Sequence, residues 1–193
     1  MQSTTVADYE AAVATMALAP VRLALAALPV MQAQGHGRIV SITSLGGKLG
    51  VPHLLPYCTA KFAAVGFSEG LRAELGRGPV TVTTVVPGLS MDAERAARQI
   101  VAGVAQRRPE IFLTPAGQVV SRLAQVAPGV TTAVPHAVQN LALPAPDGAA
   151  AGVRGRHLRG TLREPGFGTL ASMGRAAAAR FNQTGREPGP EEG

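Results

Sequence analysis

Residues 80–86, V-T-V-T-T-V-V, constrain the fold of this chain more than any other stretch. Every residue in it is β-branched, which favours extended backbone, and Pro87-Gly88 closes the segment. Residues 38–44, R-I-V-S-I-T-S, form a second short β-rich segment bounded by glycines. Both have the pattern of buried strands, and helical segments precede each of them. Alternating helices and buried strands predict a parallel α/β sheet.

Residues 4–31 carry the first helical pattern. Thr5 followed by Asp8 resembles a capping signal, and strong helix formers follow. Pro20 should kink this helix near its middle, and Pro29 should mark its end region.

The same stretch is apolar enough to suggest a membrane span or a signal peptide. Arg22 lies at its centre, where insertion would cost about 2.5–3.5 kcal/mol. Its leader carries Asp8 and Glu10 in place of a basic region. We therefore expect a buried helix of a soluble, cytoplasmic protein and no membrane contact.

The chain then reads as one α/β domain over residues 1–130, followed by a tail. Beyond residue 131 the composition shifts to Ala, Gly, Pro and Arg, so residues 131–193 are expected to be largely irregular and poorly ordered. The remaining expected elements are helices over residues 56–75, 91–106 and 117–126 and a short strand over residues 110–113.

Composition excludes some classes of function. The net charge is +6, but no aromatic-interleaved basic patch accompanies it, so we expect no nucleic-acid partner. The single cysteine, Cys58, excludes an intrachain disulfide and fits a reducing cytosol. We expect it to be a small buried apolar residue. No cluster suggests a metal site.

The candidate catalytic side chains lie between Ser44 and Lys61. Tyr57 and Lys61 are four residues apart, so on a helix they share a face. A cation beside a phenol favours the phenolate and makes the tyrosine a better proton donor and acceptor. Ser44, at the predicted strand end, could hydrogen-bond the same substrate oxygen. His53 is interpreted as a loop residue.

Together these segments resemble the short-chain dehydrogenase/reductase family. The resemblance rests on G-R-I-V-S-I-T-S, on Y-x-x-x-K at residues 57–61, on the helix that continues F-A-A-V-G-F-S-E-G-L, and on V-T-V-T-T-V-V-P-G. Their order and spacing from residue 37 to residue 88 are specific, whereas Y-x-x-x-K alone is weak. The likeness covers residues 4–127 well.

The resemblance implies a role for each of these residues. Tyr57 would be the general acid/base, Lys61 would tune it and hold the nicotinamide ribose, and Ser44 would orient the substrate oxygen. Pro87 and Gly88 would lie along the nicotinamide ring. The implied cofactor is NAD or NADP, and the implied substrate is a small carbonyl/alcohol pair.

The chain also departs from the family pattern. No strand followed by a glycine-rich, phosphate-binding turn is found, so we expect only the C-terminal half of the family fold, a partial Rossmann-like sheet. Met16 stands where the family has an asparagine, and Asp92 stands where it has a threonine. The alternative function is therefore a non-catalytic remnant that acts only as a partner in an oligomer. The family's interface helices correspond to residues 6–31 and 57–75, which predicts a homo-oligomer.

Overall fold

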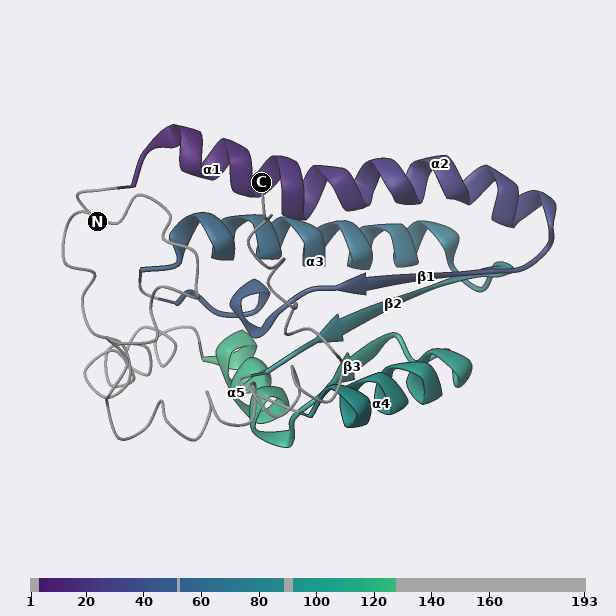
Figure 1. Cartoon of the computed structure of the whole chain (residues 1–193). Coiled ribbons are helices and arrows are strands. Elements are labelled where there is room, and N and C mark those ends of the chain that lie inside the picture. Colours follow the sequence, from purple (N-terminus) through teal and green to yellow (C-terminus); the bar gives the residue numbers. More distant parts are fainter. Residues whose placement is uncertain (1–3, 52, 89–91, 128–193) are drawn as a thin grey trace, which may run out of the picture.

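A computed structural model describes residues 4–51, 53–88 and 92–127. Its centre is a parallel sheet in the order β1-β2-β3, as expected for an α/β protein (Figure 1). The strands are β1 (Gly37–Ile42), β2 (Val80–Val86) and β3 (Glu110–Phe112). In register, Gly37 lies opposite Val80, and Thr84 lies opposite Glu110.

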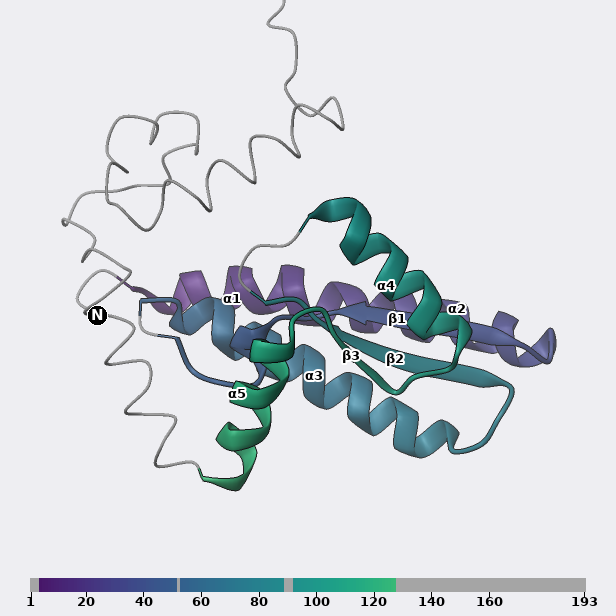
Figure 2. The same cartoon turned by 90° about the horizontal axis from the view of Figure 1, so that it is seen from below.

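Helices lie on both faces of this sheet (Figures 1 and 2). One face is covered by α1 (Val6–Val13), α2 (Ala19–Ala33) and α3 (Leu55–Leu75), and the other by α4 (Ala93–Ala105). Helix α5 (Pro115–Val126) follows β3 near the carboxyl ends of the strands. Short turns complete the fold, a π-helical turn at Ala14–Leu18 and the 3-10 turn η2 at Leu45–Gly47.

Two apolar clusters hold the layers together. On the α2/α3 face, Ala24, Leu71 and Val82 are buried. On the α4 face, Val85, Ile111 and Leu113 are buried, and Ile100 and Val104 of α4 pack against them. Because β2 is the central strand, its side chains are covered on both faces. This explains why a run of β-branched residues without a charged residue forms it, and why its threonines Thr83 and Thr84 are buried.

The N-terminal helix differs from its prediction in burial. Only 11% of its apolar stretch is buried, so the expectation of a buried helix is wrong. One side of the helix packs on α3 and β1, and the outer side, with Leu23 72% exposed, faces away from the protein. Val6–Ala33 is also long and apolar enough to cross a membrane, although one such helix near an N-terminus is weak evidence for a span.

The kink predicted at Pro20 takes the form of a π-helical turn. Proline has no amide hydrogen, so it cannot bond to the carbonyl one turn earlier. The residues just before it, Ala14–Leu18, widen to a π turn, in which the amide of Ala19 donates to the carbonyl of Ala14. Helix α2 continues past Pro29 to Ala33.

The other predicted elements agree closely with the structure. The strand expected over residues 38–44 ends at Ile42, which leaves Ser44 beyond the strand. Helix α3 and strand β2 lie where they were predicted. The predicted irregular tail, residues 131–193, lies outside the described residues.

Candidate functional site

Ser44 lies just after the carboxyl end of β1. Its backbone is extended, and its side-chain oxygen accepts a hydrogen bond from the amide of Gly46 at 3.1 Å, so Ser44 caps the short turn η2. Strand pairing ends nearby, where the amide of Thr43 donates to the carbonyl of Val85 at 2.9 Å. The serine is therefore held at the edge where the carboxyl ends of the strands meet.

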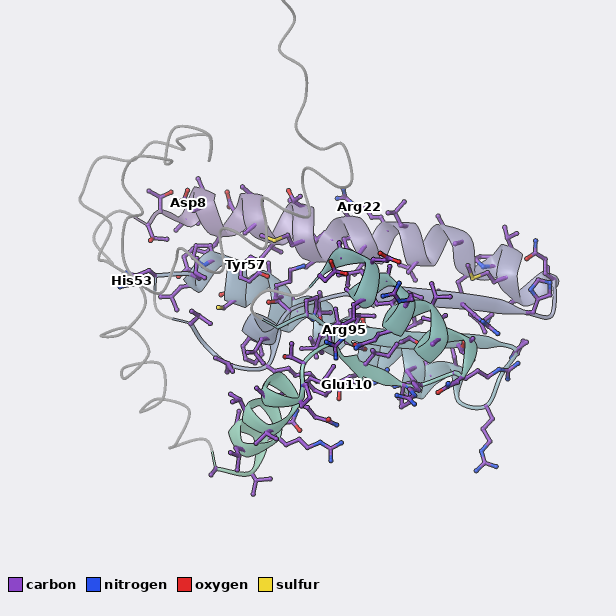
Figure 3. All side chains as sticks on the ribbon, turned by 60° about the horizontal axis from the view of Figure 1, so that its bottom comes forward. Asp8, Arg22, His53, Tyr57, Arg95 and Glu110 are labelled. Atoms are coloured by element: carbon purple, nitrogen blue, oxygen red, sulfur yellow. The ribbon has the colours of Figure 1, made fainter. Side chains whose placement is uncertain are left out.

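Tyr57 and Lys61 lie in the first turns of α3, at this same end of the sheet. Figure 3 shows Tyr57 near the start of this helix. The ammonium Nζ of Lys61 donates to the carbonyl of Ile42, the last residue of β1, at 3.2 Å. The same Nζ lies 5.8 Å from the centroid of the Tyr57 ring. Burial lowers the pKa of Lys61 from its ordinary value of 10.5. The predicted phenol–ammonium pair is therefore present, and the backbone of β1 fixes it.

Two glycines allow the Ser44 turn to pack directly on α3. A Cβ at Gly46 would lie 3.0 Å from Cε1 of Tyr57, and one at Gly47 would lie 2.7 Å from the carbonyl oxygen of Lys61. The second contact is with backbone, which cannot move aside as a flexible side chain can. These glycines therefore set how closely the serine turn approaches the tyrosine and lysine.

Lys48 fixes the far side of this turn. Its side chain is only 5% exposed, and its ammonium lies 2.7 Å from Oε1 of Glu69 on α3 and 2.9 Å from Oε1 of Glu110 on β3. Burial disfavours the charged lysine, but the two carboxylates outweigh that effect and raise the pKa of Lys48 above 10.5. The turn is thereby tied to both a helix and a strand. Sequence reasoning missed this role because the three residues are far apart in the chain.

Pro87 and Gly88 follow β2 at the same edge of the sheet. The carbonyl of Pro87 accepts a hydrogen bond from the amide of Leu45 at 3.1 Å, which joins the loops after β1 and β2. A Cβ on Gly88 would lie 2.4 Å from Oγ1 of Thr114, the residue that caps α5. A side chain at position 88 would therefore collide with Thr114, and Gly88 itself is half-buried.

The other residues singled out from the sequence lie in a buried helix position, a loop, a helical turn and a helix cap. Cys58 is buried, as expected, and its sulfur accepts a hydrogen bond from the amide of Val51 at 3.4 Å. His53 lies in the exposed loop before α3 with a left-handed backbone, φ 62°. Met16 lies in the π-helical turn, and Asp92 caps α4 by accepting from the amide of Arg95 at 3.0 Å.

The arrangement is suited to proton transfer. A phenol and an ammonium share one face of α3, and a serine hydroxyl lies on the turn that packs against them. Among the described residues, no group of three or more His, Cys, Asp or Glu side chains could hold a metal ion. The roles predicted for Ser44, Tyr57, Lys61, Pro87 and Gly88 stay predictions at this point, although all five lie at one end of the sheet.

Comparisons with known proteins place these features in context. A sequence model described as "short chain dehydrogenase" matches residues 1–99. Human 17-beta-hydroxysteroid dehydrogenase 13 is 30% identical over 134 residues, which are 60% of this chain and 45% of that protein. A dehydrogenase/reductase SDR family protein 7-like from Anopheles gambiae is 44% identical over 68 residues, which are 35% of this chain and 22% of that protein.

A solved structure shares the fold. The bulky-bulky ketone specific alcohol dehydrogenase from Comamonas testosteroni superposes with a TM-score of 0.56 at 22% identity, over 77% of this chain and 59% of that one. In each of these comparisons the chain spans less than two thirds of its relative. The family match begins at residue 1, so it gives no support to the expectation that only the C-terminal half of the family fold is present.

Proposed function

Since the chain belongs to the short-chain dehydrogenase family, whose sequence model matches half of it, we propose that it transfers hydride between NAD(P) and a small carbonyl/alcohol substrate. One observation carries this proposal: the Lys61 ammonium is fixed by the carbonyl of Ile42 and lies 5.8 Å from the ring of Tyr57. A phenol held next to a partly desolvated cation is well placed to give or take a proton on a substrate oxygen.

The residues at this end of the sheet fit the nicotinamide end of the cofactor. An ammonium has three hydrogen-bond donors, and Lys61 uses one of them to bond to the carbonyl of Ile42. The other donors can therefore bond to ribose hydroxyls. The half-buried backbone at Pro87 and Gly88 offers a surface on which a flat ring could lie. Bound NAD(P) would supply the hydride.

In this proposal the protein handles the proton and orients the substrate. Tyr57 donates its phenolic proton to the carbonyl oxygen during reduction and removes it during oxidation. Lys61 stabilises the phenolate that remains. Ser44 turns its hydroxyl toward the same substrate oxygen and so fixes the direction from which the hydride arrives.

Gly46 and Gly47 do not substitute for a phosphate-binding turn. Their lack of side chains is already explained by close packing on Tyr57 and Lys61.

The direct test is turnover by the full chain. Purified protein is mixed with NADPH or NADH and a panel of aliphatic and aromatic ketones, and loss of reduced nicotinamide is followed by absorbance. We expect turnover that falls about 10²- to 10⁴-fold in Tyr57→Phe, because that variant lacks the transferable proton. Tyr9→Phe removes the only other phenol and should retain full activity. Equal rates in the two variants would refute the assignment of Tyr57.

A second candidate function is association without catalysis. The outer side of α1–α2 exposes large apolar residues, among them Leu18, Leu23 and Leu25, and α3 exposes Phe62. Such a surface favours burial against another protein. We propose that a second copy of the chain covers it through residues 6–31 and 57–75.

Light scattering after size-exclusion chromatography tests this association. The wild-type chain should have the mass of a dimer or larger, and Leu23→Glu should shift it to a monomer because a charge would be buried in the interface. A wild-type monomer at high concentration would contradict the oligomer. A dimer that neither binds nicotinamide cofactor nor turns over would favour the non-catalytic candidate.

A further inference from the structure

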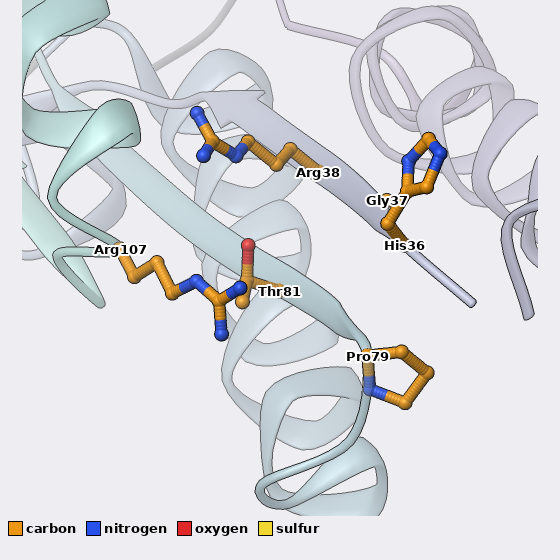
Figure 4. Close-up of a pocket in the computed structure, with 6 residues that line it drawn as sticks. All are labelled: His36, Gly37, Arg38, Pro79, Thr81 and Arg107. Atoms are coloured by element: carbon orange, nitrogen blue, oxygen red, sulfur yellow. The ribbon is translucent and has the colours of Figure 1, made fainter.

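A basic pocket lies at the amino ends of the strands, away from Ser44, Tyr57 and Lys61. It encloses about 330 Å³. Three of its lining residues are basic, one carries a hydroxyl and none is acidic: His36, Gly37, Arg38, Pro79, Thr81 and Arg107. Figure 4 shows Arg107 extending from the turn after α4 toward Thr81 on β2, while Arg38 lies on β1. Separate elements therefore bring the basic groups to one face of the sheet.

The positions of these groups follow from strand register and a fixed turn. Arg38 lies opposite Thr81 in the parallel pairing, so their side chains share a face of the sheet. The Arg107 turn is tied to β2, because Oγ1 of Thr83 donates to the carbonyl of Arg108 at 2.8 Å.

The charges in the pocket are not compensated. Within the part of the chain that the structure describes, neither Arg38 nor Arg107 makes a side-chain hydrogen bond or an ion pair. Among the described residues, Arg72 and Arg98 bond to backbone or carboxylate oxygens, whereas single exposed arginines such as Arg95 are also unpaired. The pocket differs in gathering two unpaired arginines with no acidic residue in its lining. A guanidinium matches a phosphate well because it offers several donors in a fixed plane.

Arg107 also occupies a backbone position that favours glycine. Its φ is 56°, its amide donates to the carbonyl of Val104 at 3.0 Å, and the amide of Arg108 donates to the carbonyl of Gly103 at 3.0 Å. These two bonds form a Schellman motif, in which the left-handed residue after the helix is usually glycine. Arginine at this left-handed backbone position is a second, separate reason to look for function at the site.

We propose that this pocket binds a phosphate-bearing anion, with Arg107 and Arg38 as the principal ligands and the hydroxyl of Thr81 as a further hydrogen-bonding group. Several donors from different elements suit the tetrahedral oxygens of phosphate better than a single planar carboxylate. Arg107 is the most informative residue, because glycine at position 107 would keep the turn and remove only the ligand.

This site is distinct from the proposed hydride-transfer site. The pocket lies at the start of β1 and Ser44 lies just past its end, roughly 20 Å away at about 3.3 Å per residue. In open α/β sheets, cofactors bind at the carboxyl ends of the strands. The anion held at the amino ends is therefore a separate ligand.

The test is titration of the full chain with inorganic pyrophosphate at constant ionic strength. Binding is measured by calorimetry and by changes in amide chemical shifts. We expect saturable binding, with the largest shifts at the amides of Gly37, Thr81 and Arg107. Arg107→Gly should weaken binding about tenfold or more, because it removes charge-assisted hydrogen bonds. The matched control is Arg95→Gln, which removes the same charge from an exposed position on α4 outside the pocket and should change affinity less than about twofold.

Equal weakening by the two variants would show non-specific attraction to a basic protein and would overturn the proposal. So would the absence of saturation at about 10 mM pyrophosphate, far above the range of specific anion sites. A parallel titration with ADP identifies the source of the anion. If ADP binds more tightly than pyrophosphate and Arg107→Gly weakens its binding too, the site takes the phosphate end of a nucleotide. If ADP binds no more tightly than pyrophosphate, the site takes the free anion.

Discussion

Lys48 and Lys61 at the carboxyl end of the sheet are held differently from Arg38 and Arg107 at its amino end. At the carboxyl end, Lys48 bonds to two carboxylates and Lys61 to the carbonyl of Ile42. At the amino end, Arg38 and Arg107 have no partners among the described residues, and Arg107 sits on strained backbone. The contacts at the carboxyl end therefore hold its side chains in fixed positions, as a catalytic site requires. The amino end carries positive charge that a bound anion would neutralise. The difference predicts that substitutions at the two ends change stability with opposite signs.

The largest loss of stability is expected from Lys48→Met. The variant leaves Glu69 and Glu110 near each other without the cation, and the side chain of Glu110 is only 29% exposed. Removing one partner of a buried pair typically costs about 3–5 kcal/mol. Because Glu69 is half-exposed and water can solvate it, we expect the free energy of unfolding to fall by about 2–3 kcal/mol. Urea unfolding measures it, with Arg98→Met, which breaks an exposed pair, as the control. Equal, small losses in both variants would show that the Lys48 contacts are not needed for rigidity.

Gly47→Ala should be the next most damaging change. Its Cβ would lie 2.7 Å from the backbone oxygen of Lys61, so the serine turn must move away from α3, at a cost of about 1–3 kcal/mol. Gly66→Ala is the matched control, because nothing lies within 4 Å of its Cβ and it is in the middle of α3. That control should gain about 0.5–1 kcal/mol from helix propensity. Both values come from thermal or urea unfolding, and equal signs would contradict the packing argument.

Arg107→Gly should stabilise the protein, in contrast to the changes at the carboxyl end. Glycine relieves a left-handed conformation that costs other residues about 1–2 kcal/mol, and it loses some of that gain to backbone entropy. The net gain should be about 0.5–1 kcal/mol by urea unfolding without added anions. A loss of stability would mean that the arginine side chain holds the fold together, and would weaken the contrast between the two ends.

The smallest expected effect is a difference in pH dependence between the only two lysines. Since the pKa of Lys48 is raised in the folded protein, its stabilisation is complete below pH 10.5 and is lost as pH rises through the folded value. Since the pKa of Lys61 is lowered, the folded state is favoured more as pH rises from the folded value toward 10.5. Between about pH 8 and 11, the melting temperature of wild type should therefore fall relative to that of Lys48→Met and rise relative to that of Lys61→Met. Parallel profiles would contradict this.

Local sequence patterns predicted the elements that depend on local chemistry. Strand β2 and helix α3 lie where β-branched residues and helical spacing indicated, and the pairing of Tyr57 with Lys61 followed from one helical turn. Contacts between distant segments were not predictable in this way. The pairing of Lys48 with Glu110 and the exposure of the outer side of α2 depend on which elements pack together, and no single segment encodes that.

The most direct measurement for the carboxyl end is fluorescence titration of the full chain with NADPH and with NADH, comparing wild type with Lys61→Met. If this end holds the nicotinamide ribose, wild type should bind at least one of the two cofactors saturably, and Lys61→Met should weaken that binding about tenfold, as the loss of a charged hydrogen bond predicts. Wild-type protein that binds neither cofactor up to about millimolar concentration, or a variant that binds as well as wild type, would contradict the proposed role of Lys61 and with it the proposed reaction.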